Sequence, residues 1–199
     1  MKKLALVLLA GFSFASAHAQ FAFGIKGGAN ISNVNSSGFS GTNSLVGFNA
    51  GAYLKLPLGH GLSLQPEVLY SSQGFKQSDG AGGTATYTQG YVNVPVLLKY
   101  THVTGVFIET GPQIGFLASA KASDQGVSAD WKKDLNSSDF SWVVGVGVKI
   151  PATPISLDAR YNFGLSNIDN KSETGDNFTV HNGSFQIGIM IRLFSAPGK

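Results

Sequence analysis

The sequence predicts an all-β chain that folds as an eight-stranded antiparallel up-and-down transmembrane β-barrel. Three observations lead to this prediction. Apolar and polar residues alternate with period two through eight consecutive segments, only 13% of the 199 residues are charged, and the links between the segments are alternately short and long. A soluble domain carries about a quarter charged residues, so the deficit indicates that much of the surface does not face water.

The first 19 residues have the three parts of a secretory signal peptide. Lys2 and Lys3 are basic, residues 4–14 are apolar, and Ala17-His18-Ala19 matches a cleavage site. The apolar run is shorter than the roughly 20 residues that a membrane-spanning helix needs. We therefore expect residues 1–19 to be removed, leaving residues 20–199 as one barrel domain that begins at Gln20.

Composition excludes several kinds of site. The chain has no cysteine, which excludes disulfides, thiolate metal sites and a lipoprotein anchor. Without Lys2 and Lys3, the 14 basic residues become 12 against 11 acidic ones, a net charge of +1. Since the longest basic run is the pair Lys132-Lys133, nucleic acid is not an expected partner.

Period-two alternation predicts eight strands. In residues 139–150, for example, Trp142, Val144 and Val146 share one face, and Ser141, Gly145 and Gly147 share the other. Strands of about 12–15 residues exceed the 5–6 typical of soluble proteins and suit a tilted membrane strand. The predicted strands cover residues 21–32, 46–58, 62–75, 87–100, 104–118, 139–150, 155–167 and 183–194.

The links between these segments differ in length. Short links follow the second, fourth and sixth segments, at Gly59-His60, residues 101–103 and residues 151–154. The longer links lie near residues 33–45, 76–86, 119–138 and 168–182. An outer-membrane barrel has short periplasmic turns and long outer loops, so we expect both termini in the periplasm.

The apolar face is expected to point outward, toward lipid. It carries no charge, whereas the opposite face is rich in glycine and polar residues that could fit a narrow interior. Aromatic residues group toward both ends of the strands, with Phe48, Tyr70 and Trp142 near the long loops and Tyr100 and Phe194 near the short turns. Two interfacial girdles would explain this, although ordinary β-propensity of aromatic residues is an alternative.

Three stretches resemble the small outer-membrane β-barrel domain family, whose members are often labelled porin-family or PorT-family proteins. These stretches are residues 23–30, 91–100 and 158–161, and the resemblance covers the chain from Phe21 to Phe194. It implies the barrel fold, outer-membrane lipid as surroundings and the barrel-assembly machinery as a partner during biogenesis, but no single activity. Such barrels usually end on an aromatic residue, whereas here five residues follow Phe194.

The strongest polar constellation is expected inside the barrel. Six basic and three acidic residues share the inward face, and opposite charges in a narrow lumen should pair because an unpaired buried charge is very costly. A structural plug is the simpler interpretation, and a narrow or gated pore is the functional one. The nine residues of this inner polar network are Lys26, Lys55, Glu67, Lys99, Glu109, Lys149, Asp158, Arg160 and Arg192.

No catalytic residue, cofactor-binding residue or metal ligand is expected. The histidines lie far apart, at His18, His60, His102 and His181, and no two have the spacing of metal ligands. The sequence thus favours a non-enzymatic barrel with a structural, narrow-permeation or secretion-accessory role. The alternative is an adhesin or ligand-binding barrel that acts through its outer loops.

Overall fold

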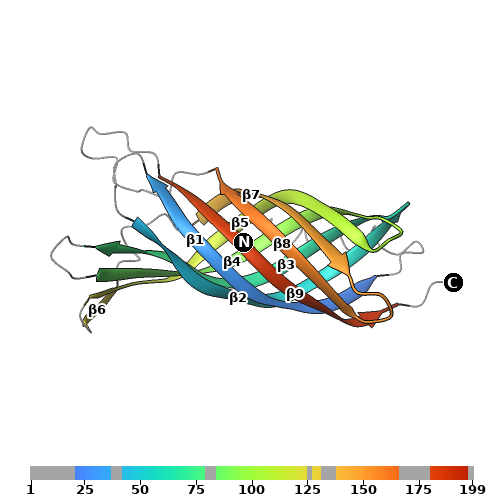
Figure 1. Ribbon diagram of the computed structural model, residues 1–199, viewed down its shortest axis with the longest axis horizontal. Coiled ribbons are helices and arrows are strands. Elements are labelled where there is room, and N and C mark those ends of the chain that lie inside the picture. The colour runs from blue at the N-terminus through green and yellow to red at the C-terminus, as the bar shows by residue number, and fades with distance from the viewer. Residues whose placement is uncertain are drawn as a thin grey trace, which may run out of the picture.

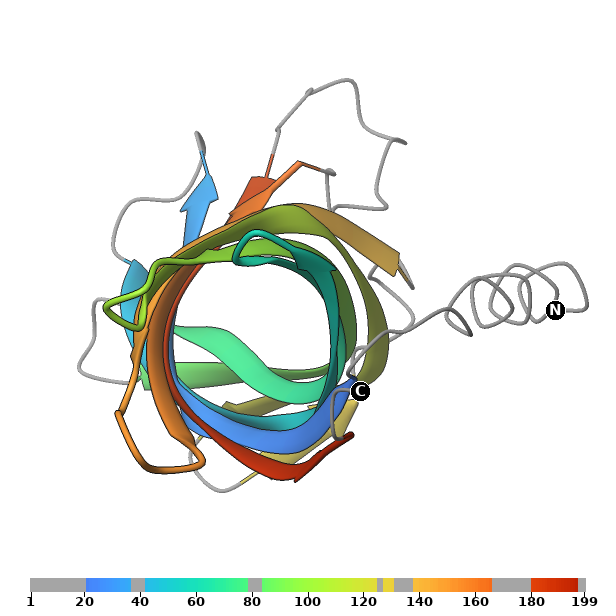
Figure 2. The same ribbon diagram turned by 90° about the vertical axis from the view of Figure 1, so that its right-hand side faces the viewer.

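The computed structural model describes residues 21–36, 42–78, 84–124, 127–130, 138–165 and 180–196. In these ranges eight antiparallel strands close into a barrel (Figures 1 and 2), which confirms the predicted fold class. The barrel strands are β1 (Ala22–Ser36), β2 (Thr42–Gly59), β3 (Leu62–Ser78), β4 (Thr84–Thr101), β5 (Val106–Asp124), β7 (Ser138–Lys149), β8 (Ile155–Gly164) and β9 (Val180–Ser195).

Closure follows from strand pairing in chain order. Each strand pairs antiparallel with its sequence neighbour, and β1 pairs with β9 from Ala22 opposite Ser195 to Ser36 opposite Val180. The barrel therefore has no free edge along its length, which a membrane requires because lipid cannot satisfy backbone hydrogen-bonding groups. No helix in the described ranges is long and apolar enough to cross a membrane.

The two faces of the strands are as predicted. Along β7, Ser141, Val143 and Gly145 are buried in the lumen, whereas Trp142, Val144 and Val146 are exposed on the outside. The same alternation leaves large apolar side chains uncovered around the outer wall, with exposed fractions from 36% for Ile191 to 70% for Val46. A soluble barrel would bury this face, so the outer surface is built for lipid.

Short turns join the strands at the end that also holds Ala22 and Ser195 (Figure 1). Between β2 and β3, His60 and Gly61 both have positive φ, at 52° and 81°, as a two-residue type I′ turn requires. Gly105 has φ 90° in the next turn, and Ala152 has φ 59° in the turn between β7 and β8. The three predicted short links are thus confirmed, with bounds of 60–61, 102–105 and 150–154 in place of the predicted 59–60, 101–103 and 151–154.

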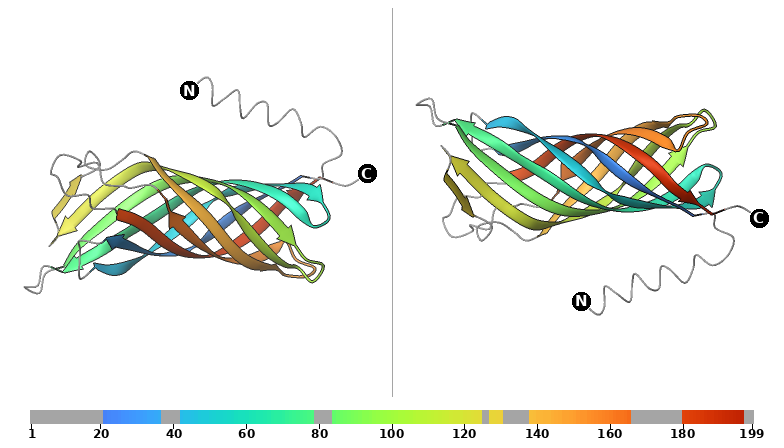
Figure 3. Two further views of the ribbon diagram at one scale, coloured as in Figure 1. Left: turned by 90° about the horizontal axis from the view of Figure 1, so that it is seen from above. Right: turned by 90° about the horizontal axis from the view of Figure 1, so that it is seen from below.

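At the opposite end seven of the eight barrel strands run further than the alternation predicted, whereas β8 ends at Gly164 and not at residue 167. β5 continues to Asp124 and pairs there with an additional short strand, β6 (Val127–Asp130), so the predicted link over residues 119–138 is partly wrong. Figures 1 and 3 show β3, β4, β5 and β6 reaching beyond the other strands. The reason is that these extensions are rich in Ala, Ser and Thr, which keep the ladder of hydrogen bonds without an apolar lipid-facing pattern.

The predicted signal peptide, residues 1–19, lies outside the described residues, as do most of the predicted link 168–182 and residues 197–199 at the end of the chain. The described strands enclose the lumen of the barrel. Seen along the barrel axis, the strands form a closed ring around it (Figure 2).

Candidate functional site: the lumen of the barrel

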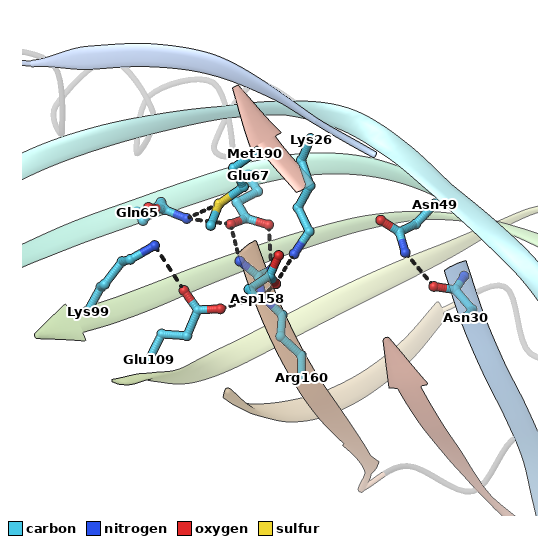
Figure 4. A network of polar contacts seen from close by, with 10 residues as sticks. All are labelled: Lys26, Asn30, Asn49, Gln65, Glu67, Lys99, Glu109, Asp158, Arg160 and Met190. Atoms are coloured by element: carbon cyan, nitrogen blue, oxygen red, sulfur yellow. Dashed lines mark hydrogen bonds and ion pairs between the residues drawn. The ribbon is translucent and has the colours of Figure 1, made fainter. Parts of the chain in front are cut away.

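Inward-pointing charged residues form a cluster in the half of the lumen nearer the short turns. Six of the nine residues of the inner polar network belong to it and are each less than 5% exposed: Lys26, Glu67, Lys99, Glu109, Asp158 and Arg160. They come from five strands, because every second residue of each strand points inward and the register aligns these positions at one height. We call these six residues the charged cluster (Figure 4).

Arg160 on β8 lies at the centre of the charged cluster. Its two terminal nitrogens each lie 2.7 Å from an oxygen of Glu67, so that this pair is bidentate. Its Nε lies 2.5 Å from Glu109 Oε1 and 2.7 Å from Asp158 Oδ2. One guanidinium therefore connects three carboxylates. Arginine suits this position better than lysine because its planar guanidinium presents donors on three nitrogens, whereas lysine has a single ammonium.

The two lysines complete the charged cluster from either side. Lys26 Nζ donates to Asp158 Oδ2, and Lys99 Nζ lies 3.4 Å from Glu109 Oε2. The charged cluster thus holds three cations and three anions, which balance. Each of the six charges has an ion-pair partner, which offsets the cost of removing it from water, whereas loss of any one member would leave the charged cluster with an unbalanced buried charge.

Two glycines on the strands beside β8 leave room for these side chains. Gly145 lies opposite Arg160, and a Cβ there would come within 2.9 Å of Arg160 Cγ and 3.0 Å of Glu109 Oε1. Gly188 lies opposite Asp158, and a Cβ there would come within 2.6 Å of Asp158 Oδ1. These glycines of the inward face are thus part of the site, since the narrow barrel could not otherwise hold the long side chains.

The remaining three residues of the inner polar network do not join the charged cluster. Lys55 is half-buried, Lys149 and Arg192 are exposed, and none of them makes an ion pair with a described residue. They lie at the short-turn mouth, where they line a cavity of about 80 Å³ together with Lys99. The structure therefore divides the nine residues into a buried neutral group and a basic mouth.

Between these two groups lies a layer of uncharged side chains that the sequence analysis did not single out. Phe107, Tyr53 and Met190 pack together and are each at most 7% exposed. Lys99 Nζ lies 3.4 Å from the centroid of the Phe107 ring, a cation–π contact, and Gln65 donates to Glu67 Oε1 at 2.7 Å. Phe107 lies two residues before Glu109, and Met190 lies two residues before Arg192, so each shares the inward face of its strand with a residue of the inner polar network. The period-two alternation could therefore have identified both as inward-facing residues.

On the loop side of the charged cluster, the lumen is filled by amides and hydroxyls. Asn49 donates to Asn30 Oδ1 at 2.5 Å, and Asn30 donates to Ser71 Oγ at 2.8 Å. Across the lumen, Gln113 donates to Ser141 Oγ at 3.0 Å. A small cavity of about 10 Å³ lies in this half, lined by residues such as Asn93, Asn162 and Ser184, so neutral polar side chains continue the filling of the lumen toward the loops.

The described residues contain no group of three or more His, Cys, Asp or Glu side chains that could hold a metal ion. His60 and His102 are exposed in separate turns, and the His102 ring lies 3.0 Å from Thr104 Oγ1. The three carboxylates that could act chemically, Glu67, Glu109 and Asp158, are instead held in ion pairs inside the charged cluster. What this arrangement does physically is fill and lock the lumen.

Comparisons with solved structures show the same fold. The Neisserial surface protein A matches with a TM-score of 0.56 and 15% sequence identity, over 86% of this chain and 97% of that one. The attachment invasion locus protein Ail of Yersinia pestis, in complex with sucrose octasulfate, matches with a TM-score of 0.50 and 19% identity, over 87% of this chain and 99% of that one. The comparison with curated proteins found no match.

A family model, described as outer membrane protein beta-barrel domain, matches residues 13–170. It agrees with the closed eight-stranded barrel, the exposed apolar wall and the short turns at one end. It confirms the resemblance seen in the sequence, although the narrower porin and PorT labels are not part of its description. The chain belongs to the outer membrane protein β-barrel domain family, and its place is the outer membrane.

Proposed function

We propose that this protein is a non-enzymatic structural barrel with a sealed lumen, which spans the outer membrane and supports its outer loops. The observation that carries this proposal is the charged cluster, in which Arg160 joins Glu67, Glu109 and Asp158 across the lumen. A rigid barrel needs its interior filled, and here charged and amide side chains fill it.

The seal is supported by the separation of the two cavities. One lies at the short-turn mouth and the other in the loop-side half, and the charged cluster lies between them. An ion that crossed the lumen would have to displace side chains that hold each other at 2.5–2.7 Å. The narrow-permeation role is therefore disfavoured relative to the structural one.

The same geometry supports the absence of catalysis in the lumen. A catalytic carboxylate has to reach a substrate, whereas Glu67, Glu109 and Asp158 are each at most 3% exposed and are engaged by Arg160. Their physical role is to neutralise the buried cations.

Planar-bilayer recording tests the sealed lumen. The refolded wild-type protein should show no stepwise conductance. Glu67→Gln combined with Glu109→Gln removes two of the three partners of Arg160 and should raise water and ion access to the lumen. Reconstitution is checked in both proteins by the shift in electrophoretic mobility between folded and heated samples. Large steady currents through the wild-type protein would overturn the proposal.

A second candidate, in which the loops bind a ligand, is favoured by one feature of the fold. β3, β4, β5 and β6 continue beyond the other strands at the loop end and form a raised wall of ordered strand there (Figure 3). Rigid elements at the tip of a barrel are suited to positioning binding loops. The structure of Ail with a heparin analogue shows that a barrel of this fold can bind a sulfated ligand.

This candidate is tested by shortening the wall. Deletion of residues 122–129, which include the paired ends of β5 and β6, should leave the barrel folded and abolish binding of immobilised heparin if the loop end binds sulfated ligands. Equal retention of the wild-type and shortened proteins would exclude that role for the β5–β6 hairpin.

A further inference from the structure

The short-turn mouth of the lumen contains a cavity with an unusual concentration of positive charge. It has a volume of about 80 Å³ and opens toward the periplasmic end of the barrel. Four basic side chains line it, one each from β2, β9, β4 and β7: Lys55, Arg192, Lys99 and Lys149. We call this cavity the basic vestibule.

Among the described residues, no acidic side chain lines the basic vestibule. In the charged cluster beneath it, three cations balance three anions, so the surplus of three cations in the inner polar network lies entirely at this mouth, in Lys55, Lys149 and Arg192. Lys99 alone among the four reaches a carboxylate, at 3.4 Å from Glu109. Like charges that share a small cavity repel one another, and a bound anion would remove this repulsion.

Polar groups beside the cations are also placed to donate. Thr101 is one of the residues that line the basic vestibule, and its Oγ1 is a buried atom without a hydrogen-bond partner among the described residues. Ser156, opposite Lys149 in the register, lines it as well. A buried hydroxyl without a partner is costly, and an oxyanion in the cavity would satisfy it.

We propose that the basic vestibule binds a phosphate-type oxyanion from the periplasmic side. Lys55, Lys149 and Arg192 would supply charge and charge-assisted hydrogen bonds, and Thr101 a neutral donor. The layer of Tyr53, Phe107 and Met190 forms the floor, so the anion stops at the mouth. This site goes beyond the structural role proposed above and is compatible with a sealed lumen.

Titration of the refolded full-length mature protein with inorganic phosphate in zwitterionic detergent tests this proposal. Amide chemical shifts of Thr101 and Ser156 should move saturably, and calorimetry should give the same dissociation constant. Lys55→Gln combined with Lys149→Gln and Arg192→Gln should weaken binding at least tenfold. Arg192→Lys alone keeps the charge and should retain most of the affinity.

The matched control removes two cations from the other end of the barrel. Lys76 and Lys121 lie near the loop ends of β3 and β5, so Lys76→Gln with Lys121→Gln should leave phosphate binding unchanged. Folding of every variant is checked by its heat-dependent electrophoretic mobility. Absence of saturable shifts in the wild-type protein, or equal binding by the triple variant, would show that these side chains are merely solvated.

A lipid headgroup and a free phosphate share this chemistry, and membrane composition separates them. The titration is repeated in nanodiscs of phosphatidylcholine alone and in nanodiscs that contain phosphatidylglycerol. If phosphatidylglycerol competes with inorganic phosphate for the site, a headgroup of the inner leaflet is the natural occupant. If the affinity is the same in both membranes, the site takes a soluble phosphate from the periplasm.

Discussion

Arg160 shows how one side chain can organise the inside of a membrane barrel. Its guanidinium contacts three carboxylates from three strands, β3, β5 and β8. Because each partner lies on a different strand, the ion pairs link β3 to β8 across the lumen, where no backbone hydrogen bond can. The arrangement adds a transverse restraint to a wall that is otherwise held by neighbouring strands.

Asp158 is contacted at its Oδ2 by both Lys26 and Arg160, so its loss would leave Lys26 without an ion-pair partner among the described residues and would remove one of the three partners of Arg160. Asp158→Ala should therefore lower the free energy of unfolding by about 3–5 kcal/mol, the usual cost of breaking a buried ion pair from one side. Urea unfolding in lipid vesicles, followed by tryptophan fluorescence, measures this change.

Lys149→Ala is the control for that measurement. Lys149 is inward-facing but exposed and has no ion pair among the described residues, so its removal should change stability by no more than about 0.5 kcal/mol. Equal effects of the two substitutions would show that the charged cluster does not stabilise the barrel.

For single residues, the sequence predicted which face of the strand a side chain points to better than it predicted which residues that side chain contacts. Period-two parity placed Lys26, Glu109 and Arg160 on the inward face, and the structure has them there. Parity could not predict that Lys55, Lys149 and Arg192 would remain apart from the charged cluster, because that depends on how the register between strands sets the height of each residue. Ion pairs across the lumen depend on how the closed barrel brings distant strands together, so they cannot be predicted from any one segment of the sequence.

The strand β7 shows how lipid on one face and the packed lumen on the other limit the residues that a barrel strand can carry. Val146 is 55% exposed on the outer wall, and its neighbour Gly147 faces the packed lumen, where a Cβ would come within 2.6 Å of the Phe107 ring. The outward position tolerates bulk but not charge, whereas the inward one tolerates neither. Small and large residues therefore alternate along this strand for two different reasons.

Val146→Arg should destabilise the barrel by about 2–4 kcal/mol, the cost of an arginine on the lipid face near the bilayer midplane. The change is measured by urea unfolding in vesicles. Val103→Arg is the matched control, because Val103 is 96% exposed in the turn between β4 and β5. Val103→Arg should have little effect, and an equally small effect of Val146→Arg would mean that the apolar wall does not contact lipid.

The strands were predictable where apolar and polar residues alternate, and they were not predictable beyond the point where this alternation ends. The lipid-facing parts of all eight barrel strands follow the alternation closely. Their extensions toward the loops do not, because a strand outside the bilayer has no apolar face to display. Strands β5 and β6 pair outside this region, with Lys121 opposite Asp130 and Ser123 opposite Ser128. The alternation marks only the residues that face lipid, so it could not predict this pairing.

The whole molecule is a closed barrel with an apolar outer wall and a polar interior. Its aromatic residues fit this arrangement at both ends, with the rings of Phe21 and Phe194 5.6 Å apart near the short turns and those of Phe48 and Tyr70 5.9 Å apart further toward the loops. Aromatic rings at both membrane surfaces fix the height of a barrel in the bilayer.

The sequence predicts that export through a cleaved signal peptide brings the chain to this membrane. The basic start, the apolar run and Ala17-His18-Ala19 predict that the mature protein begins at Gln20. Mass spectrometry of the protein from the outer-membrane fraction should therefore show Gln20 at its N-terminus. An intact Met1 on protein from that fraction would refute cleavage at this site.

Thiol accessibility tests the sealed, lipid-facing barrel most directly, because the natural chain has no cysteine. Single cysteines replace Val143 and Leu97 on the inward face, Val144 and Val146 on the outer wall, and Val103 in a turn. A charged water-soluble reagent should modify only the cysteine at position 103, and an apolar reagent should also modify those at 144 and 146. Modification of the inward cysteines at 97 and 143 by the water-soluble reagent would contradict the account, because it would show that water fills the lumen.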